Sequence, residues 1–271
     1  MAKQSVLITG VYGLVGGAIY KRLIGKSDVY DVYGLSRRNR ASERVADHET
    51  VILPEEKFTQ SDLSDMGILI DAFRGKDTVV HMAANPSGEA GWESLEKTNI
   101  QGCYHVFEAA YQAGVKRIVY ASTIQVSSGY IKFAEPYKSI AKGDVEGLNG
   151  ELPSLKADEP TWPINLYAAT KVFAESLGRV YSSKSDGPSC IGIRIGWVAS
   201  GDELPRKSAS HLFCSQRDIA KLIECCIQAE DTVRCEIFYG MSRNKYLWTD
   251  IERAREVVGY APDDDDSRFH D

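Results

Sequence analysis

A tyrosine and a lysine four residues apart could carry out proton transfer. The stretch Tyr167-Ala-Ala-Thr-Lys171 places both side chains on one face of a predicted helix, about one turn apart. A nearby ammonium favours the phenolate form of tyrosine, whose unperturbed pKa is about 10, and so lets the phenol act near neutral pH. The lysine can also reach the ribose of a nicotinamide. Because such pairs also decorate the surfaces of ordinary helices, this one needs support from other motifs.

Glycines spaced three apart follow the first predicted strand, in the sequence TGVYGLVG of residues 9–16. Such glycines permit a tight turn and close approach of the backbone to a pyrophosphate, and the following helix offers free N–H groups. The same pattern can be only a tight corner between a strand and a helix. As a dinucleotide site, the turn uses Gly10, Tyr12, Gly13, Leu14, Val15 and Gly16.

The end of the second predicted strand bears on the choice of cofactor. NAD-preferring enzymes usually carry an acidic residue here for the ribose hydroxyls, whereas this chain reads Ser36-Arg37-Arg38. Arginine suits a 2′-phosphate, so the sequence predicts NADP as the preferred cofactor, with NAD as the alternative. The arginines can also be no more than a solvated loop. Further cofactor contacts are expected after the third and fourth strands, at Asp62, Leu63, Ala83 and Ala84.

Apolar runs of strand length alternate with amphipathic stretches of helix length. This alternation predicts an α/β fold with a doubly wound parallel sheet, the Rossmann fold. We expect a single domain over 1–271, with a dinucleotide-binding core to about residue 200, a small substrate-binding part over about 200–262, and an acidic tail at 263–271 that frays. An irregular excursion over 130–163 interrupts the alternation, and a long loop of this kind is often functional.

Composition narrows the function classes. The 271 residues carry a formal net charge of −6, which disfavours nucleic acid as a partner. No stretch approaches the roughly 20 apolar residues of a membrane span, and the first residues lead directly into a strand, so a cytoplasmic location is expected and no membrane association. The six cysteines lack the spacing of a zinc site or a disulfide framework, and buried reduced thiols are expected.

The motifs occur in a specific order: the glycine-rich turn, Asp-Leu, small residues after the fourth strand, Asn99, Ala-Ser-Thr after the fifth, and YxxxK. Over residues 4–200 this order resembles the extended short-chain dehydrogenase/reductase superfamily, which is epimerase/dehydratase-like. The resemblance implies a catalytic triad of Thr123, Tyr167 and Lys171. It also implies cofactor contacts at Ala121, Ser122, Ile195 and Asn99, although the side chain of Asn99 can equally be structural.

Within that superfamily the chain is similar to uronate dehydrogenases and to archaeal NAD-dependent glucose-6-phosphate dehydrogenases, through HMAANPSGEAGWESLEKTNIQG, SQRDIAKLIECC and IERAREVVGY. Only about 70 residues follow the strand CIGIRIG, which disfavours nucleotide-sugar substrates. The kinship implies hydride transfer from the anomeric carbon of a uronate, an aldose or a sugar 6-phosphate to nicotinamide, which yields a lactone. Substrate contacts are then expected at Ser87, Ile124, Gln125 and Arg206, with Lys207 as an alternative to Arg206 and a solvated loop as another reading of that pair.

Three departures from the subfamily leave the substrate open: the pair Ile124-Gln125, the missing acidic residue after the second strand, and the excursion over 130–163. Ile124-Gln125 stands where the subfamily has Asn-His, and the loss of the asparagine amide removes a hydrogen bond to sugar. A sugar epimerase that recycles its hydride is an alternative, whereas dehydration is disfavoured because no acidic residue follows Thr123. A non-catalytic NADP sensor is the third reading, although such proteins often lack the tyrosine or lysine. The helix around YxxxK has an apolar stripe that suits either a homodimer or the core.

Overall fold

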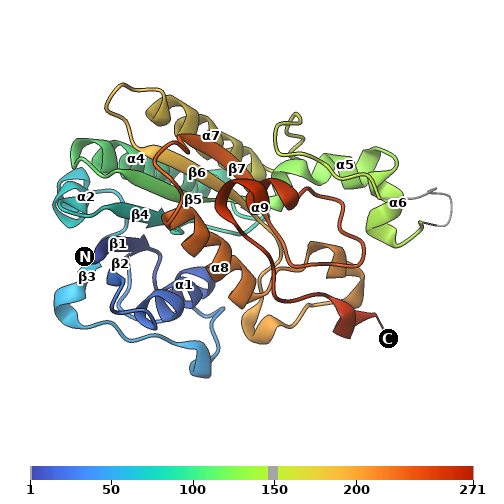
Figure 1. Cartoon of the computed structure of the whole chain (residues 1–271), viewed down its shortest axis with the longest axis horizontal. Helices are drawn as coiled ribbons and strands as arrows, with labels where there is room; N and C mark the ends of the chain where they lie inside the picture. The colour runs from blue at the N-terminus through green and yellow to red at the C-terminus, as the bar shows by residue number, and fades with distance from the viewer. Residues whose placement is uncertain (1, 146–151, 271) are drawn as a thin grey trace.

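The computed structural model describes residues 2–145 and 152–270, and its centre is a sheet of seven parallel strands (Figure 1). The strand order is β3-β2-β1-β4-β5-β6-β7. The order reverses between β1 and β4, so the crevice outside the carboxyl ends of these strands is the expected ligand site of a doubly wound sheet. The strands are β1 (Gln4–Thr9), β2 (Tyr30–Ser36), β3 (Phe58–Gln60), β4 (Thr78–His81), β5 (Arg117–Thr123), β6 (Ser189–Ile195) and β7 (Cys235–Gly240).

Helices cover both faces of the sheet. One layer consists of α2 (Met66–Phe73), α4 (Gly102–Gln112) and α7 (Leu166–Ser182), which pack against one another. The opposite layer contains α1 (Leu14–Ile24) and α8 (Gln216–Ile227), which lie side by side, with α9 (Glu252–Val258) against α8 and β7. The predicted Rossmann-type architecture is therefore confirmed.

Alternate residues of a strand belong to two separate apolar cores, because successive side chains of a strand point to opposite faces of the sheet. Val6 and Ile8 of β1 face the layer of α1 and α8, whereas Leu7 between them faces α2, α4 and α7. All three are at most 1% exposed. Burial on both faces explains why these strands read as continuous apolar runs.

Short helical segments complete the chain between these main elements. A four-residue helix, α3 (Trp92–Leu95), continues directly into a π-helical stretch, η3 (Glu96–Gln101), and then into α4. The 3₁₀ turns are η1 (Asp47–Glu49), η2 (Glu55–Lys57), η4 (Ile124–Ser127), η5 (Ser200–Asp202), η6 (Lys207–Leu212) and η7 (Ser267–Phe269).

The excursion over 130–163 is more ordered than the sequence suggests. It contains most of α5 (Ser128–Phe133) and all of α6 (Tyr137–Lys142), which lie beyond the end of the sheet in Figure 1. Ile140 and Leu155 are buried with Trp248 in a third apolar cluster, and residues 146–151 lie outside the described residues. The composition is rich in Gly, Pro, Lys and Glu, but these few apolar side chains are enough to anchor the segment.

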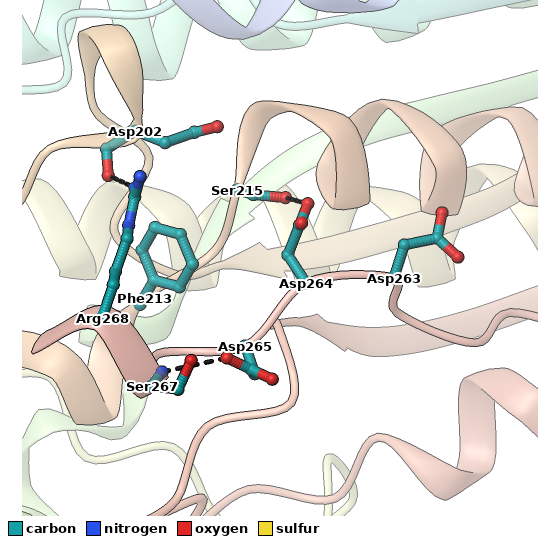
Figure 2. Close-up of a pocket in the computed structure, with 8 residues that line it drawn as sticks. All are labelled: Asp202, Phe213, Ser215, Asp263, Asp264, Asp265, Ser267 and Arg268. Carbon is teal, nitrogen blue, oxygen red and sulfur yellow. Dashed lines mark hydrogen bonds between the residues drawn. The ribbon is translucent and has the colours of Figure 1, made fainter. Parts of the chain in front are cut away.

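The acidic C-terminal segment does not fray, which corrects the prediction from its composition. The backbone N–H groups of Asp263 and Asp264 donate to the buried carboxylate of Asp218, and Asp264 also pairs with Arg217. Phe269 is only 8% exposed, with its ring centroid 5.2 Å from that of Phe213. The segment thereby lines a cavity of about 260 Å³ together with Asp202, Phe213, Ser215 and Arg268 (Figure 2).

Two further features bear on the class of protein. In the described part of the chain, no helix combines the length and apolar character needed to cross a bilayer. All six cysteines are free thiols, and the four at 103, 190, 214 and 226 are buried.

Candidate active site

The glycine-rich turn packs directly against the end of β4. Gly10 has a left-handed backbone, with φ at 71°, and its N–H donates to the Leu35 carbonyl at 2.7 Å. A Cβ added at Gly10 would lie 2.8 Å from the backbone nitrogen of Ala83, and one at Gly16 would overlap the Gly10 carbonyl oxygen. Both positions therefore need glycine, for the close approach of three backbone segments rather than for flexibility.

The helix that follows the turn presents an uncompensated N-terminus. Gly13 is the N-cap of α1, no side chain caps the helix, and its first turn, which begins Leu14-Val15, holds no acidic residue. The ring of Tyr12 packs edge-on against Phe58, with centroids 5.2 Å apart, so the turn offers its backbone rather than this ring. Free N–H groups, positive potential and a backbone without side chains fit a pyrophosphate, which is what a dinucleotide would place here.

The predicted adenosine contacts lie at the ends of β2 and β3. Arg37 and Arg38 are exposed just beyond β2, and the Arg37 carbonyl accepts a hydrogen bond from Gln60 at 3.0 Å. Ser36 accepts from the N–H of Ser61 at 3.0 Å, which joins the two strand ends. Leu63 is buried with φ at 72°, an uncommon conformation for leucine that turns the chain sharply after the exposed Asp62.

Thr9 and His81 connect the ends of β1 and β4. The Thr9 hydroxyl accepts from the N–H of Ala83 at 3.2 Å and lies 2.8 Å from Nδ1 of His81. Burial, with the charge of Lys171 adding to it, lowers the pKa of His81 to about 3, so the ring is neutral. Since the hydroxyl proton is free to point at Nδ1, His81 can carry its own proton on Nε2. The bond from Ala83 to Thr9 fixes Ala83 beside the glycine-rich turn, and the next residue, Ala84, is half-buried.

The structure brings together the three residues of the predicted triad. Thr123 ends β5, Tyr167 and Lys171 lie on α7, and each of the three is at most 6% exposed. Burial raises the pKa of the Tyr167 phenol, and a hydrogen bond with the Thr123 side chain works in the opposite direction. Lys171 Nζ lies 5.9 Å from the centroid of the Tyr167 ring. The arrangement can therefore move a proton at the phenol oxygen, next to a hydroxyl and an ammonium.

Lys171 is an ammonium held in a nearly dry site. Its Nζ donates to the carbonyl of Ala121 at 2.9 Å. Burial lowers the pKa of Lys171 to about 8, and the small effect of Cys103 in the opposite direction does not restore it. The amine can thus change its charge near pH 8.

The N-terminus of α7 is fixed by Asn165, which sequence reasoning missed. Its Oδ1 accepts from the N–H of Ala168 at 2.8 Å, the usual N-cap bond, while its Nδ2 donates to Oε1 of Gln125 at 2.8 Å. Gly88 lies against both side chains, so the exposed Ser87 of the loop after β4 is close to them. The predicted substrate residues Ser87 and Gln125 therefore gather next to the helix that carries Tyr167, and Ile124 is buried between Thr123 and Gln125.

A buried polar network lies directly beneath the triad. The Ser122 hydroxyl donates to Glu175 at 2.7 Å, and Arg194 of β6 binds both oxygens of that carboxylate, at 2.9 and 3.0 Å. Arg194 also donates to the Tyr239 hydroxyl, which lies 2.9 Å from that of Ser127. The hydroxyl of Ser122 is therefore used inside the protein. The only signal in the sequence is that Glu175 follows Lys171 by four residues and so shares its helix face.

Asn99 joins three segments through its side chain. It lies in η3, where its Oδ1 accepts from the N–H of Asn85 at 2.8 Å. Its Nδ2 donates to the carbonyl of Asn85 at 3.0 Å and to Thr170 Oγ1 at 3.1 Å. These bonds support the structural alternative that the sequence left open for this amide.

Arg206 lies on the segment that follows β6, where it is the N-cap residue of η6. The residue is exposed, and its charge, after burial, helps to lower the pKa of His211 to about 4. Ile195, at the end of β6, pairs in register with Thr123 across the sheet. The latter contact places Ile195 at the carboxyl edge of the sheet, next to the triad.

Comparisons with known proteins identify the family. The model of the "NAD dependent epimerase/dehydratase family" matches residues 6–258. NAD-dependent glucose-6-phosphate dehydrogenase of Haloferax volcanii is 32% identical over 98% of this chain and 95% of its own. L-arabinose 1-dehydrogenase (NAD(P)(+)) of the same organism is 34% identical over 74% of this chain and 70% of its own. The crystal structure of uronate dehydrogenase from Agrobacterium tumefaciens superposes with a TM-score of 0.75, at 25% identity over 100% of this chain and 88% of that one. By sequence, architecture and the order of its motifs, this chain belongs to the NAD dependent epimerase/dehydratase family.

Proposed function

We propose that this chain is an NAD(P)-dependent sugar dehydrogenase that oxidises the anomeric carbon of a uronate, an aldose or a sugar 6-phosphate. The observation that carries the proposal is the meeting of Thr123, Tyr167 and Lys171 at the carboxyl edge of the sheet, beside a turn fitted to a pyrophosphate. The dehydrogenase class agrees with the glucose-6-phosphate, arabinose and uronate dehydrogenases to which the chain is similar.

In this proposal each triad residue has a separate role. Tyr167 takes the proton of the anomeric hydroxyl as general base, and Thr123, hydrogen-bonded to the phenol, orients the sugar oxygen. Lys171 stabilises the phenolate through its charge and binds the nicotinamide ribose. A nicotinamide held beside Lys171 would supply the acceptor for the hydride of the anomeric carbon. The sugar leaves as a lactone, which water opens afterwards.

The remaining predicted residues hold the two ligands in place. The glycine-rich turn with Gly10, Gly13 and Gly16 supports the pyrophosphate, and the ends of β2 to β6 line the rest of the dinucleotide. Ser87, Ile124 and Gln125 contact the sugar from beside Asn165. Arg206 or Lys207 meets a carboxylate or phosphate of the substrate. Residues 1 to about 200 then form the dinucleotide-binding part and 200–262 the smaller substrate-binding part.

We further propose NADP as the preferred cofactor, with NAD as a second substrate. The support is the pair Arg37 and Arg38, which is exposed at the end of β2 where an acidic residue would otherwise bind the ribose hydroxyls. Replacing both arginines with Asp and Ser, as Arg37→Asp and Arg38→Ser, is expected to weaken NADPH binding at least about tenfold while sparing NADH. Equal losses for both cofactors in a fluorescence titration would contradict the NADP assignment.

Absorbance at 340 nm tests the main proposal. Purified protein is incubated with NAD or NADP and a panel of uronates, aldoses and sugar 6-phosphates, beside Tyr167→Phe. We expect reduced cofactor to accumulate with at least one sugar, and the variant to lose about 10²- to 10⁴-fold in rate while it still binds cofactor. Tight cofactor binding without net reduction would favour the epimerase, for which the readout is interconversion of sugar epimers, or the sensor.

Exposed apolar side chains on α4 and α7 suggest a homodimer. On α4 and α7, the large side chains of Tyr104, Leu166 and Val180 are between 44% and 54% exposed. We propose that these faces pack against a second copy, since apolar helix faces of this size are commonly covered. Light scattering coupled to gel filtration should give about twice the chain mass, and Val180→Glu should shift it to the monomer. A wild-type monomer at micromolar concentration would exclude the dimer.

A further inference from the structure

Residues 42–49, which we call the strap, join two regions that are far apart in the sequence. At one end, the N–H of Ser42 donates to the carbonyl of Tyr12 in the glycine-rich turn at 2.9 Å. At the other end, η1 reaches the segment that follows β6 and the first residue of α8. Because α1 and α8 lie side by side, the strap runs past the N-terminal ends of both helices.

The far end of the strap is held by a single carboxylate. Glu49 accepts hydrogen bonds from the Ser200 hydroxyl, the Gly201 N–H at 2.8 Å and the Gln216 amide, and also from the N–H of Ala46 at 3.2 Å. Partial burial acts to raise the pKa of Glu49, but these donors outweigh it and lower the pKa to about 2. The Glu49 carboxylate is therefore ionised near neutral pH, so the attachment of the strap does not depend on pH in that range.

Arg44 lies two residues after the bond between Ser42 and Tyr12, and its side chain is exposed. Its positive charge acts on the phenol of Tyr167, which is on α7, in the helix layer opposite to α1 and α8. Arg44 is exposed, and within residues 2–145 and 152–270 it belongs to none of the ion pairs. An exposed arginine that forms none of these ion pairs thus lies two residues from the backbone bond that joins the strap to the glycine-rich turn.

We propose that the strap is a clamp over the bound dinucleotide and that Arg44 binds its pyrophosphate. The inference rests on the proposed function, because it requires a dinucleotide bound at the glycine-rich turn. The pyrophosphate is favoured over the 2′-phosphate because the strap is bonded to the turn two residues before Arg44, whereas a 2′-phosphate would lie at Arg37 and Arg38. A guanidinium can bind two phosphate oxygens at once.

Fluorescence titrations with NADH and NADPH test the clamp without relying on turnover. Arg44→Gln is expected to weaken the binding of NADH and of NADPH by the same factor, about ten to one hundred, because a charge-assisted hydrogen bond is lost. Arg44→Lys should recover part of the affinity. The matched control is Arg40→Gln, an exposed arginine before the Ser42 bond, which should leave NADH binding within about twofold of the wild type.

Two outcomes would overturn the role of Arg44: unchanged binding in Arg44→Gln, or a loss confined to NADPH, which would move the arginine to the 2′-phosphate. Glu49→Gln tests the clamp itself. It should speed amide hydrogen exchange in residues 42–49 and weaken NADH binding, whereas faster exchange with full NADH affinity would exclude the clamp. If the wild type binds neither cofactor, the proposed function fails before this inference is reached.

Discussion

Lys171 is buried at a cost in stability. Its ammonium is 5% exposed and has one backbone carbonyl as a hydrogen-bond partner, the oxygen of Ala121. Burial of a charge without a counter-ion disfavours the charged form, which is why the pKa falls to about 8 from an unperturbed value near 10.4. The folded protein therefore contains a group that would be better solvated in the unfolded chain.

This burial makes stability depend on pH. Between pH 8 and about 10.4 the unfolded chain binds the Lys171 proton more tightly than the folded one, so the free energy of unfolding rises with pH in that window. By pH 9.5 the wild type should gain about 2 kcal/mol relative to Lys171→Met, compared with pH 7. Urea unfolding of both proteins at the two pH values measures the difference. A difference that does not change with pH would mean that Lys171 keeps its ordinary pKa.

At the level of single residues, spacing predicts only what a helix by itself dictates. Tyr167 and Lys171 share a face because they are four residues apart, and that much was readable from the sequence. The partners of Asn165 and Glu175 come from segments 40 and 19 residues away, so no local pattern indicates them. The bond between Tyr167 and Thr123 likewise exists only once β5 and α7 have packed.

Among the elements, α7 combines the most functions. Its N-terminus is capped by Asn165. Lys171 bonds the helix to β5, and Glu175 bonds it to β6. Tyr167, Lys171 and Glu175 follow each other at intervals of four, so one helix face carries the proposed base, the ammonium and the buried carboxylate. The Glu175–Arg194 pair, with 3% and 2% of its side chains exposed, thus fixes the helix relative to the sheet.

Removal of one member of this pair should be far more harmful than removal of both. Glu175→Leu leaves the Arg194 guanidinium buried without a counter-ion and is expected to cost about 4 kcal/mol of unfolding free energy. Arg194→Met should cost a similar amount, whereas the double variant should recover most of the loss. A double-mutant cycle by urea unfolding measures this coupling. Strictly additive losses would show that the pair is not coupled, and Lys21→Ala on the exposed face of α1 is a suitable control.

The strands of the sheet were predictable because both of their faces are apolar, and the flanking helices because each has one apolar stripe. The excursion over 130–163 was not, since its order depends on a few side chains such as Ile140 and Leu155 that meet Trp248 from a distant part of the chain. The C-terminal segment was misread for the opposite reason. Four consecutive aspartates suggest repulsion and solvation, but Ser215, Arg217 and Lys221 at the start of α8 provide partners for them.

At the scale of the whole molecule, the C-terminal segment packs over α8 and over the segment that follows β6. Phe269→Ala should cost about 3 kcal/mol because it removes a buried ring that packs on Phe213. A chain that ends at Pro262 should lose at least as much unfolding free energy, because it also lacks the two backbone N–H groups that donate to the buried Asp218. Thermal unfolding measures both, and Arg255→Ala on the outer side of α9 is the control. An unchanged midpoint for the shortened chain would contradict the packed tail.

The position of the two ends has a practical consequence. β1 starts at the amino edge of the sheet, near the N-terminus, whereas η7 near the C-terminus lies on the opposite side of the molecule (Figure 1). His270 is hydrogen-bonded to Asp266, and Arg268 contacts Asp202, next to the residues that hold the strap. A sensor or an immobilised catalyst built from this protein should therefore be attached to its support through the N-terminus, because tension on the C-terminus would be transmitted directly to the rim of the active site.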